Sequence, residues 1–228
     1  MKTNSSLFLL TLIFLFVFSI PVSGQEPEIK RTYWKNGKLK TEIHFKDGKE
    51  EGLYAFWYES GKKMAELNFH KGKQDGLTKE WYESGKKKQD FYFKSGKLEG
   101  QVTSWYESGA KESETLYRNG RKEGLHVTWH ESGHKEREAY FKSGMLEGKA
   151  TSWYEFGVTR NETHFVNGEP DGLMVDWYPS GEKWMELRHK NGILDGVQTE
   201  LYKSGEKKSI ALYENGKKTH EKNFIDGD

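Results

Sequence analysis

The chain has 228 residues, of which 34% are hydrophobic, 31% charged and 14% aromatic, and its formal net charge is +1. This near-neutral balance argues against nucleic-acid binding, because contacts with phosphates need a local excess of cationic side chains. The sequence contains no cysteine, which excludes disulfides, thiol nucleophiles and thiolate metal sites. Its many aromatic residues argue against a disordered chain.

The N-terminus is predicted to be a secretory signal peptide, residues 1–24. Lys2 precedes an apolar run that ends at Ile20, and Pro21 breaks this run. Small residues at Val22-Ser23-Gly24 offer a cleavage site. The run is short for a membrane span, although an uncleaved anchor is the alternative. We therefore expect an exported protein that is periplasmic, envelope-associated or secreted.

Residues 33–228 are predicted to form an array of 24-residue repeats, after a flexible polar leader at 25–32. Three glycine columns recur every 24 residues, beginning at Gly37, Gly48 and Gly52, and they include nearly all of the 25 glycines. A repeat this regular indicates one elongated body in which each unit touches its neighbours.

Each unit contains two strand segments, such as 53–58 and 63–69, separated by glycine-containing turns. Glycine recurs too often for helices, since each glycine would cost about 1 kcal/mol inside a helix. The loop Glu59-Ser60-Gly61 is a short hairpin connection in which the glycine supplies a positive φ. The second connection, 70–76, is expected to be a longer linker. The corresponding turn glycines are Gly61, Gly85, Gly109, Gly133, Gly157 and Gly181. The pattern predicts an all-β fold, an elongated single-layer antiparallel sheet that forms a meander of β-hairpins, with about sixteen strands.

An aromatic column also follows the 24-residue step. Because side chains alternate between the two faces of a strand, we expect one face to carry this aromatic–aliphatic ladder. The other face is expected to be striped with charge, including an acidic column that contains Glu66. The ladder is either sheet core or an open strip where a partner binds. Its members are Trp57, Trp81, Trp105, Trp129, Trp153 and Trp177.

The C-terminal segment departs from the expected phase. Residues 215–227 match 36–48 at their landmarks, yet they directly follow a half-unit of the same kind. We interpret this as a terminal cap in which one tryptophan-type strand has been skipped, as terminal repeats are often atypical.

No residue set points to catalysis, a cofactor or a metal. The serines of the Glu-Ser-Gly loops recur in most units, as turn residues do. His126, His130 and His134 form the one histidine cluster, and His130 and His134 flank a hairpin turn. Metal capture there is the alternative to solvated surface histidines. We expect the carboxylate columns to form ion pairs with neighbouring lysines rather than to bind Ca²⁺.

One unit carries the pattern Gly37-Lys38, Phe45, Gly48-Lys49, Glu51-Gly52, Trp57-Tyr58 and Gly61-Lys62. This pattern resembles the MORN-repeat variant family, many bacterial members of which are described as "toxin–antitoxin system YwqK-family antitoxin". The resemblance covers about residues 33–227. It implies an elongated antiparallel sheet used as a scaffold, with proposed protein or phospholipid binding, and the antitoxin description implies binding to a toxin.

We therefore expect an exported, non-enzymatic repeat protein that acts as a protein-binding or scaffolding surface. The alternatives are neutralisation of a toxin partner in the antitoxin sense, and lipid or glycan contact at the cell envelope through the Trp/Tyr ladder. The expected partner is another protein, without nucleic acid, and membrane or lipid contact stays open. Free sheet edges at the two ends also predict end-to-end self-association. A strict monomer in sedimentation at high concentration would contradict that idea.

Overall fold

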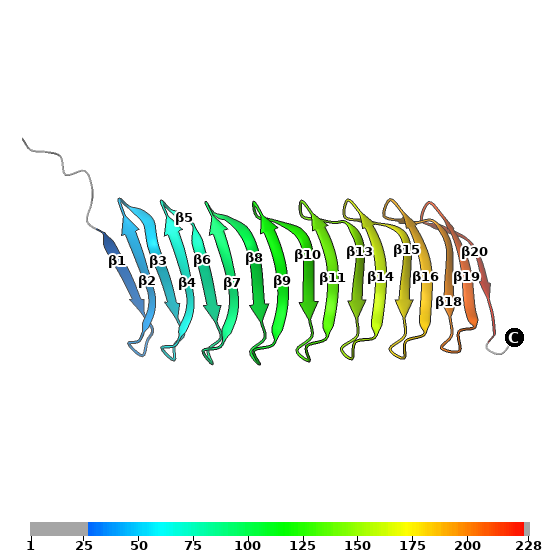
Figure 1. The fold of residues 1–228 in the computed structure, drawn as a ribbon, viewed down its shortest axis with the longest axis horizontal. Helices are drawn as coiled ribbons and strands as arrows, with labels where there is room; N and C mark the ends of the chain where they lie inside the picture. Colours follow the sequence, from blue (N-terminus) through cyan, green and yellow to red (C-terminus); the bar gives the residue numbers. More distant parts are fainter. Residues whose placement is uncertain (1–26, 226–228) are drawn as a thin grey trace, which may run out of the picture.

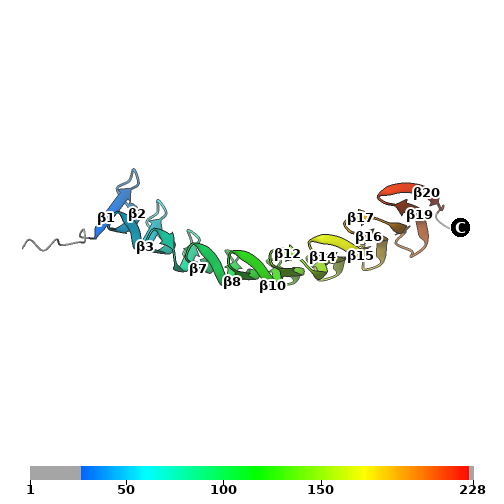
Figure 2. The same cartoon turned by 90° about the horizontal axis from the view of Figure 1, so that it is seen from above.

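The computed structural model describes residues 27–225, and these form a single open antiparallel sheet without a helix (Figure 1). Successive full-length strands pair with one another in chain order, so the topology is a meander. Seen from above, the sheet is one layer thick, bows along its length and twists toward its ends (Figure 2), as antiparallel sheets do. The prediction of an all-β single-layer sheet is confirmed. The predicted signal peptide, residues 1–24, lies outside the described residues.

The sheet has 20 strands, somewhat more than expected. Their bounds are β1 Glu28–Tyr33, β2 Leu39–Lys46, β3 Lys49–Trp57, β4 Lys63–His70, β5 Lys73–Gln74, β6 Gly76–Trp81, β7 Lys87–Lys94, β8 Lys97–Trp105, β9 Lys111–Arg118, β10 Arg121–Trp129, β11 Lys135–Lys142, β12 Met145–Leu146, β13 Gly148–Trp153, β14 Thr159–Val166, β15 Glu169–Trp177, β16 Lys183–Lys190, β17 Ile193–Leu194, β18 Gly196–Leu201, β19 Lys207–Glu214 and β20 Lys217–Asn223. The surplus comes from β5, β12 and β17, which have two residues each and are separated from the following strand by one residue.

Two kinds of turn alternate along the array. The Glu-Ser-Gly loops close with a hydrogen bond from the N–H of Gly61 to the carbonyl of Tyr58, at 2.8 Å in the first full unit. The six predicted turn glycines all have positive φ, at 89, 90, 99, 90, 88 and 102° in chain order. These loops therefore have the backbone geometry that their glycines predict.

The second connection is much tighter than expected. Lys71 and Gly72 both have positive φ, 51 and 77°, as the central residues of a two-residue type I′ turn do. The chain rejoins the sheet at Lys73, so the prediction of a long linker over 70–76 is wrong. Gly76, with φ 114°, instead makes a bulge within the continuing strand. The prediction failed because it did not allow a non-glycine residue a positive φ.

The array also begins earlier than expected. Strand β1 starts at Glu28, within the segment 25–32 that was predicted to be a flexible leader. Arg31 in β1 forms an ion pair with Glu42 in β2 at 2.7 Å, and the hydroxyls of Thr32 and Thr41 are 2.7 Å apart. These cross-strand contacts explain why a short polar segment is part of the sheet.

The C-terminal strand is present rather than skipped. Asn215 and Gly216 form the same positive-φ turn as Asn191 and Gly192, and β20 pairs with β19 directly after it. The hydroxyl of Tyr202 donates to the carbonyl of Phe224 at 3.2 Å, as the equivalent tyrosines do to tryptophan carbonyls. Strand β20 therefore stands in the place of the tryptophan-type strand, but it is one residue out of phase, since Tyr202 reaches a residue 22 positions along the chain and Tyr58 one 23 positions along.

The cross-strand register places the acidic column on a different face of the sheet from the one that the sequence predicts. Ala55 lies opposite Glu66 of β4 and opposite Glu42 of β2, so the acidic column is on the same face as the aliphatic part of the ladder. We call this the tryptophan face, defined by the columns of Leu53, Ala55, Trp57 and Glu66. The tyrosine face is defined by the columns of Tyr54, Phe56, Tyr58 and Ala65. The expectation of one aromatic face and one charged face is wrong, because alternation along a strand does not fix cross-strand register.

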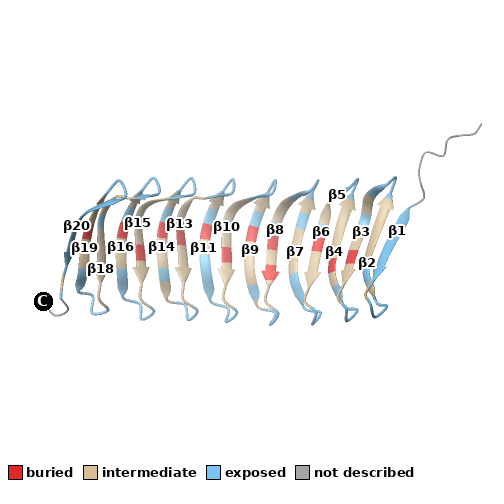
Figure 3. Ribbon diagram, turned by 180° about the vertical axis from the view of Figure 1, so that it is seen from behind, coloured by how far each residue is buried: buried red, intermediate tan, exposed pale blue. Residues whose placement is uncertain are grey.

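The core is thin and made of small residues. Thr78, Ala139 and Ala55 are 0, 1 and 3% exposed, whereas the tryptophans of the ladder are half-buried. Buried positions lie in the middle of the strands (Figure 3). Because no second layer covers either face, a small side chain is buried only where larger neighbours on adjacent strands shield it.

Candidate functional site

The tryptophan ladder lies beneath lysine side chains on the tryptophan face. The ammonium groups of Lys87, Lys111 and Lys135 lie 4.7, 5.2 and 5.8 Å from the ring centroids of Trp105, Trp129 and Trp153. The same lysines form ion pairs with the acidic column, at 2.6 Å to Asp90, 2.8 Å to Glu114 and 2.5 Å to Glu138. At these three positions the contacts favour the sheet-core interpretation of the ladder over an open strip.

Trp57 of the ladder lines a partly apolar hollow. With Trp34, Phe56 and Met64 it surrounds a space of about 440 Å³ near the N-terminal end of the sheet. The ammonium of Lys40 lies 4.5 Å from the ring centroid of Trp34. The hollow is therefore partly apolar, with a cation beside its aromatic wall.

A row of exposed apolar residues runs beside the ladder on the tryptophan face. This apolar row consists of Leu77, Tyr92, Leu116, Leu125 and Tyr140, which are 41, 42, 39, 52 and 48% exposed. Leu77 lies directly opposite Tyr92, and Leu125 directly opposite Tyr140, so the row crosses strands β6 to β11. The sequence alone does not identify the tyrosine neighbours of the two leucines, since these pairs depend on the cross-strand register.

Tyrosine hydroxyls connect each unit to the next on the tyrosine face. Tyr58 donates to the carbonyl of Trp81 at 2.8 Å, Tyr82 to Trp105 at 2.8 Å and Tyr106 to Trp129 at 2.7 Å. Tyr154 and Tyr178 make the same contact in later units. Partial burial raises the pKa of the Tyr58, Tyr82 and Tyr106 hydroxyls. The sequence shows the tyrosine column, but a hydrogen bond to a residue 23 positions away has no local signal.

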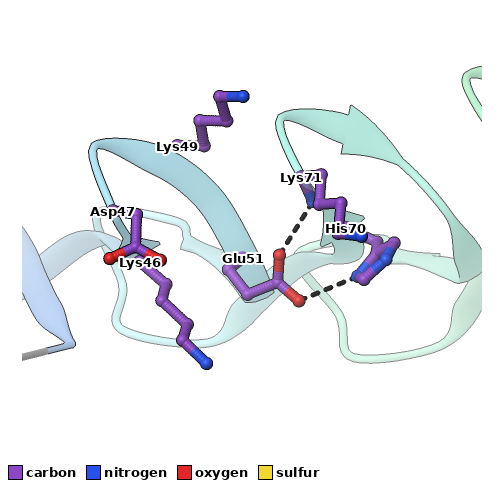
Figure 4. Close-up of a pocket in the computed structure, with 6 residues that line it drawn as sticks. All are labelled: Lys46, Asp47, Lys49, Glu51, His70 and Lys71. Atoms are coloured by element: carbon purple, nitrogen blue, oxygen red, sulfur yellow. Dashed lines mark hydrogen bonds and ion pairs between the residues drawn. The ribbon is translucent and has the colours of Figure 1, made fainter. Parts of the chain in front are cut away.

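Carboxylates connect the units at the opposite edge. Glu51 accepts hydrogen bonds from the backbone N–H of Lys71 at 2.8 Å and from the His70 ring at 2.9 Å (Figure 4). The Lys71 N–H, and secondly the His70 ring, lower the pKa of this carboxyl. A lowered pKa means that the stabilisation is present at neutral pH and is lost as the pH falls through the folded-state value. The same cap recurs at Asp75, Glu99, Glu123, Glu147 and Asp171.

These caps give a structural reason for the Glu-Gly pair at the start of each unit. The carboxylate immediately before the bulge glycine reaches the next positive-φ turn and satisfies its backbone N–H. Glu51 lines a hollow of about 370 Å³ between the first turns, and both of its oxygens are already engaged. This hollow therefore offers no free carboxylate from Glu51.

The histidine cluster does not converge. His130 Nε2 lies 3.2 Å from the carbonyl of Trp153, and His134 Nδ1 lies 3.0 Å from that of Glu155. Both rings thus contact backbone of the following unit. Over residues 27–225 no group of three or more histidine, aspartate and glutamate side chains is arranged to hold a metal ion.

Five segments of the chain match a family model described as the MORN repeat variant, namely residues 29–47, 50–71, 74–95, 98–119 and 146–167. Together they cover a little under half of the chain. No curated protein matches the sequence significantly. Within the part that the structure describes, no helix is long and apolar enough to span a membrane.

Two solved structures illustrate how weak the wider similarity is. One is entitled "Crystal Structure of TcdB2-TccC3-Cdc42": it is 10% identical over 84% of this chain and 13% of that chain, with a TM-score of 0.23. A porin-like protein from Bacteroides uniformis is 9% identical over 86% of this chain and 93% of that chain, with a TM-score of 0.20. This chain spans only a small part of the TcdB2-TccC3-Cdc42 chain. Both TM-scores are too low to support a conclusion about fold or function.

Proposed function

We propose that this protein, an all-β array carrying MORN repeats of the variant type, is an exported, non-enzymatic surface that binds or scaffolds a partner protein. The observation that supports the proposal most is the apolar row. Five leucine and tyrosine side chains stay about half exposed over strands β6 to β11, with Gln101 of β8 opposite Leu116, beside a line of paired lysines and carboxylates. An apolar centre with a charged rim is the usual composition of a protein interface.

The spacing of the row favours an amphipathic helix as the bound segment. Leu77 and Leu125 occupy the same position two units apart, with Leu116 between them. Equivalent strands of neighbouring units are two strand spacings apart, about 10 Å. This is close to the rise of about 10.5 Å over seven helical residues. A helix lying across the strands would therefore present an apolar side chain at each unit.

The array is already rigid before a partner arrives. Tyrosine hydroxyls connect the units at one edge and carboxylate caps connect them at the other, so binding would order few additional groups on this side of the interface. Pre-organisation of this kind lowers the entropic cost of association.

The test is a double substitution in the apolar row, Leu125→Ser with Tyr140→Ser. Because both side chains are about half exposed, we expect the thermal unfolding of the variant to change little. We expect its capture of partner proteins by cross-linking in the native cell to fall at least about tenfold, as when a central apolar anchor is lost. The matched control is Leu173→Ser with Val197→Ser, which removes side chains of similar exposure beyond the row. Unchanged capture by the Leu125/Tyr140 variant, or equal losses in both, would contradict the proposal.

Toxin neutralisation in the antitoxin sense is the alternative within the same class of binding. It differs in location, since a cytosolic toxin requires a cytosolic antitoxin. We expect mass spectrometry of the fractionated, tagged chain to find an N-terminus near Gln25 outside the cytoplasm. An intact Met1 form confined to the cytosol would overturn export and favour the antitoxin.

Lipid or glycan contact is the further alternative. The lysines over Trp105, Trp129 and Trp153 argue against an open aromatic strip at these positions.

A further inference from the structure

One unit breaks the chemical regularity of the tyrosine face. Arg137 is the one charged residue at its repeat position, where the other units have Thr41, Ala65, Gln89, Ser113, Asn161, Met185 and Ser209. Lys122 is also cationic where most equivalents are not, namely Glu50, Gln74, Leu98, Leu146, Pro170 and Leu194, with Lys218 of the last strand as the other cation in this column. In the same unit His130 replaces the tyrosine that clamps the next unit elsewhere. The concentration of basic groups in this one unit therefore needs its own explanation.

These basic groups surround a hollow. Arg137, Arg160, His126 and His130 line a space of about 380 Å³ over strands β10 to β14, together with Thr128 and Ser152. Ser152 lies directly opposite Arg137 on one side and Asn161 on the other. The two arginines thus stand on either side of Ser152, about two strand spacings or 10 Å apart.

Neither arginine has an anionic partner. Among residues 27–225 no ion pair joins Arg137 or Arg160 to a carboxylate, and the contact of Arg160 is with the Tyr154 ring at 5.9 Å. The equivalents of Arg160 behave differently: Lys208 reaches Glu200 at 2.8 Å and Lys88 reaches Glu80 at 3.9 Å. The residue that corresponds to those two glutamates is Ser152.

The other polar side chains in and beside the hollow form no ion pair with the two arginines. Glu136 lines it without an ion pair to either arginine, and the nearby Asp176 accepts a hydrogen bond from Asn161 at 2.6 Å. His126 uses Nδ1 to contact the Thr115 hydroxyl at 2.6 Å. Burial, and secondly Lys122, lower the pKa of His126, because both disfavour the charged imidazolium.

We propose that this hollow is a binding site for a phosphate-type oxyanion, held between the Arg137 and Arg160 guanidinium groups with the Thr128 and Ser152 hydroxyls as further donors. Guanidinium groups recognise tetrahedral oxyanions through paired N–H donors. The hollow is on the opposite face of the sheet from the apolar row, so this site is independent of the proposed protein-binding surface. The open side of the hollow leaves room for the molecule that carries the phosphate.

The experiment is a titration of the full chain with inorganic phosphate, followed by NMR of the His126 and His130 ring resonances. Potassium chloride at matched ionic strength separates specific binding from screening. We expect saturable shifts with phosphate and none with chloride. The double variant Arg137→Gln with Arg160→Gln should bind at least about tenfold more weakly, because it loses both charged donors. Arg188→Gln, an exposed arginine opposite Leu173 on the tryptophan face, is the matched control and should bind as the unchanged chain does.

Shifts that do not saturate, or equal binding by the double variant and the unchanged chain, would overturn the site. The Leu125→Ser/Tyr140→Ser variant should keep phosphate binding, so failure of this inference and failure of the proposed function are distinguishable. Sedimentation with phosphatidylcholine vesicles, with and without phosphatidic acid, identifies the source of the group. Binding to free phosphate alone indicates a soluble phosphate compound, and additional arginine-dependent binding to the acidic vesicles indicates a lipid headgroup.

Discussion

Replacing Trp105 by alanine is expected to lower the free energy of unfolding by about 2–3 kcal/mol, below the range for a fully buried tryptophan because this one is half-buried. Two contributions are lost together. The indole shields the thin core beneath it, and its ring lies 4.7 Å from the Lys87 ammonium, a cation–π contact. No second layer of the sheet can move in to fill the space. Urea unfolding followed by circular dichroism measures the change.

Trp105→Phe is the matched control for that substitution. It keeps an aromatic ring under Lys87 and leaves the backbone carbonyl that accepts the Tyr82 hydroxyl in both variants. We expect it to cost less than Trp105→Ala, because it removes a smaller part of the side chain. If Trp105→Ala instead kept full stability but abolished partner capture, the ladder and not the apolar row would be the binding surface.

Gly76→Ala is expected to cost about 3 kcal/mol, because φ there is 114° and non-glycine residues in such regions carry strain of about 1–3 kcal/mol. A Cβ at this position would also lie 3.0 Å from the Cβ of Asn68, which cannot turn away. Asn68 additionally donates from its amide to the Leu77 carbonyl at 2.7 Å, so displacing it would disturb the bulge. Thermal unfolding of the purified variant measures the loss.

Gly100→Ala provides the comparison in the same column. Its φ is 81° and a Cβ there would meet nothing within 4 Å, so only the backbone strain of a non-glycine residue in the left-handed region applies, about 1–2 kcal/mol. Equal losses at Gly76 and Gly100 would show that steric crowding contributes nothing and that backbone strain alone sets the cost.

The fold could be predicted from the repeat because the strands and turns of each unit are determined by residues within that unit. The Glu-Ser-Gly loops, the alternating strands and the absence of helices all follow from residues within one unit, and they appear as predicted. What failed depended on contacts between units. The faces of Ala55 and Glu66, the start of the sheet at Glu28 and the role of Phe224 are set by cross-strand register, to which a single strand gives no guide.

The same holds for the candidate surfaces: their residues could be identified from the sequence, but the contacts between units could not. The sequence identified Trp105 and its equivalents but not the lysines that lie over them, because those lysines come from the preceding unit, as Lys87 does. The pairing of Leu125 with Tyr140 needed the register. The sequence shows that Arg137 differs from the other residues of its column. Only the cross-strand register shows that Ser152 lies between the strands of Arg137 and Arg160, so that no carboxylate stands between the two arginines.

The connections between units also bear on how such a chain reaches its folded state. The tyrosine clamps span 23 residues and the carboxylate caps 20, so no connection of either kind reaches beyond the adjoining unit. The entropy of closing these short loops is the same for every unit, however long the array. Folding can therefore nucleate at any unit and propagate in both directions. Such a chain avoids the slow long-range pairing that delays most all-β proteins.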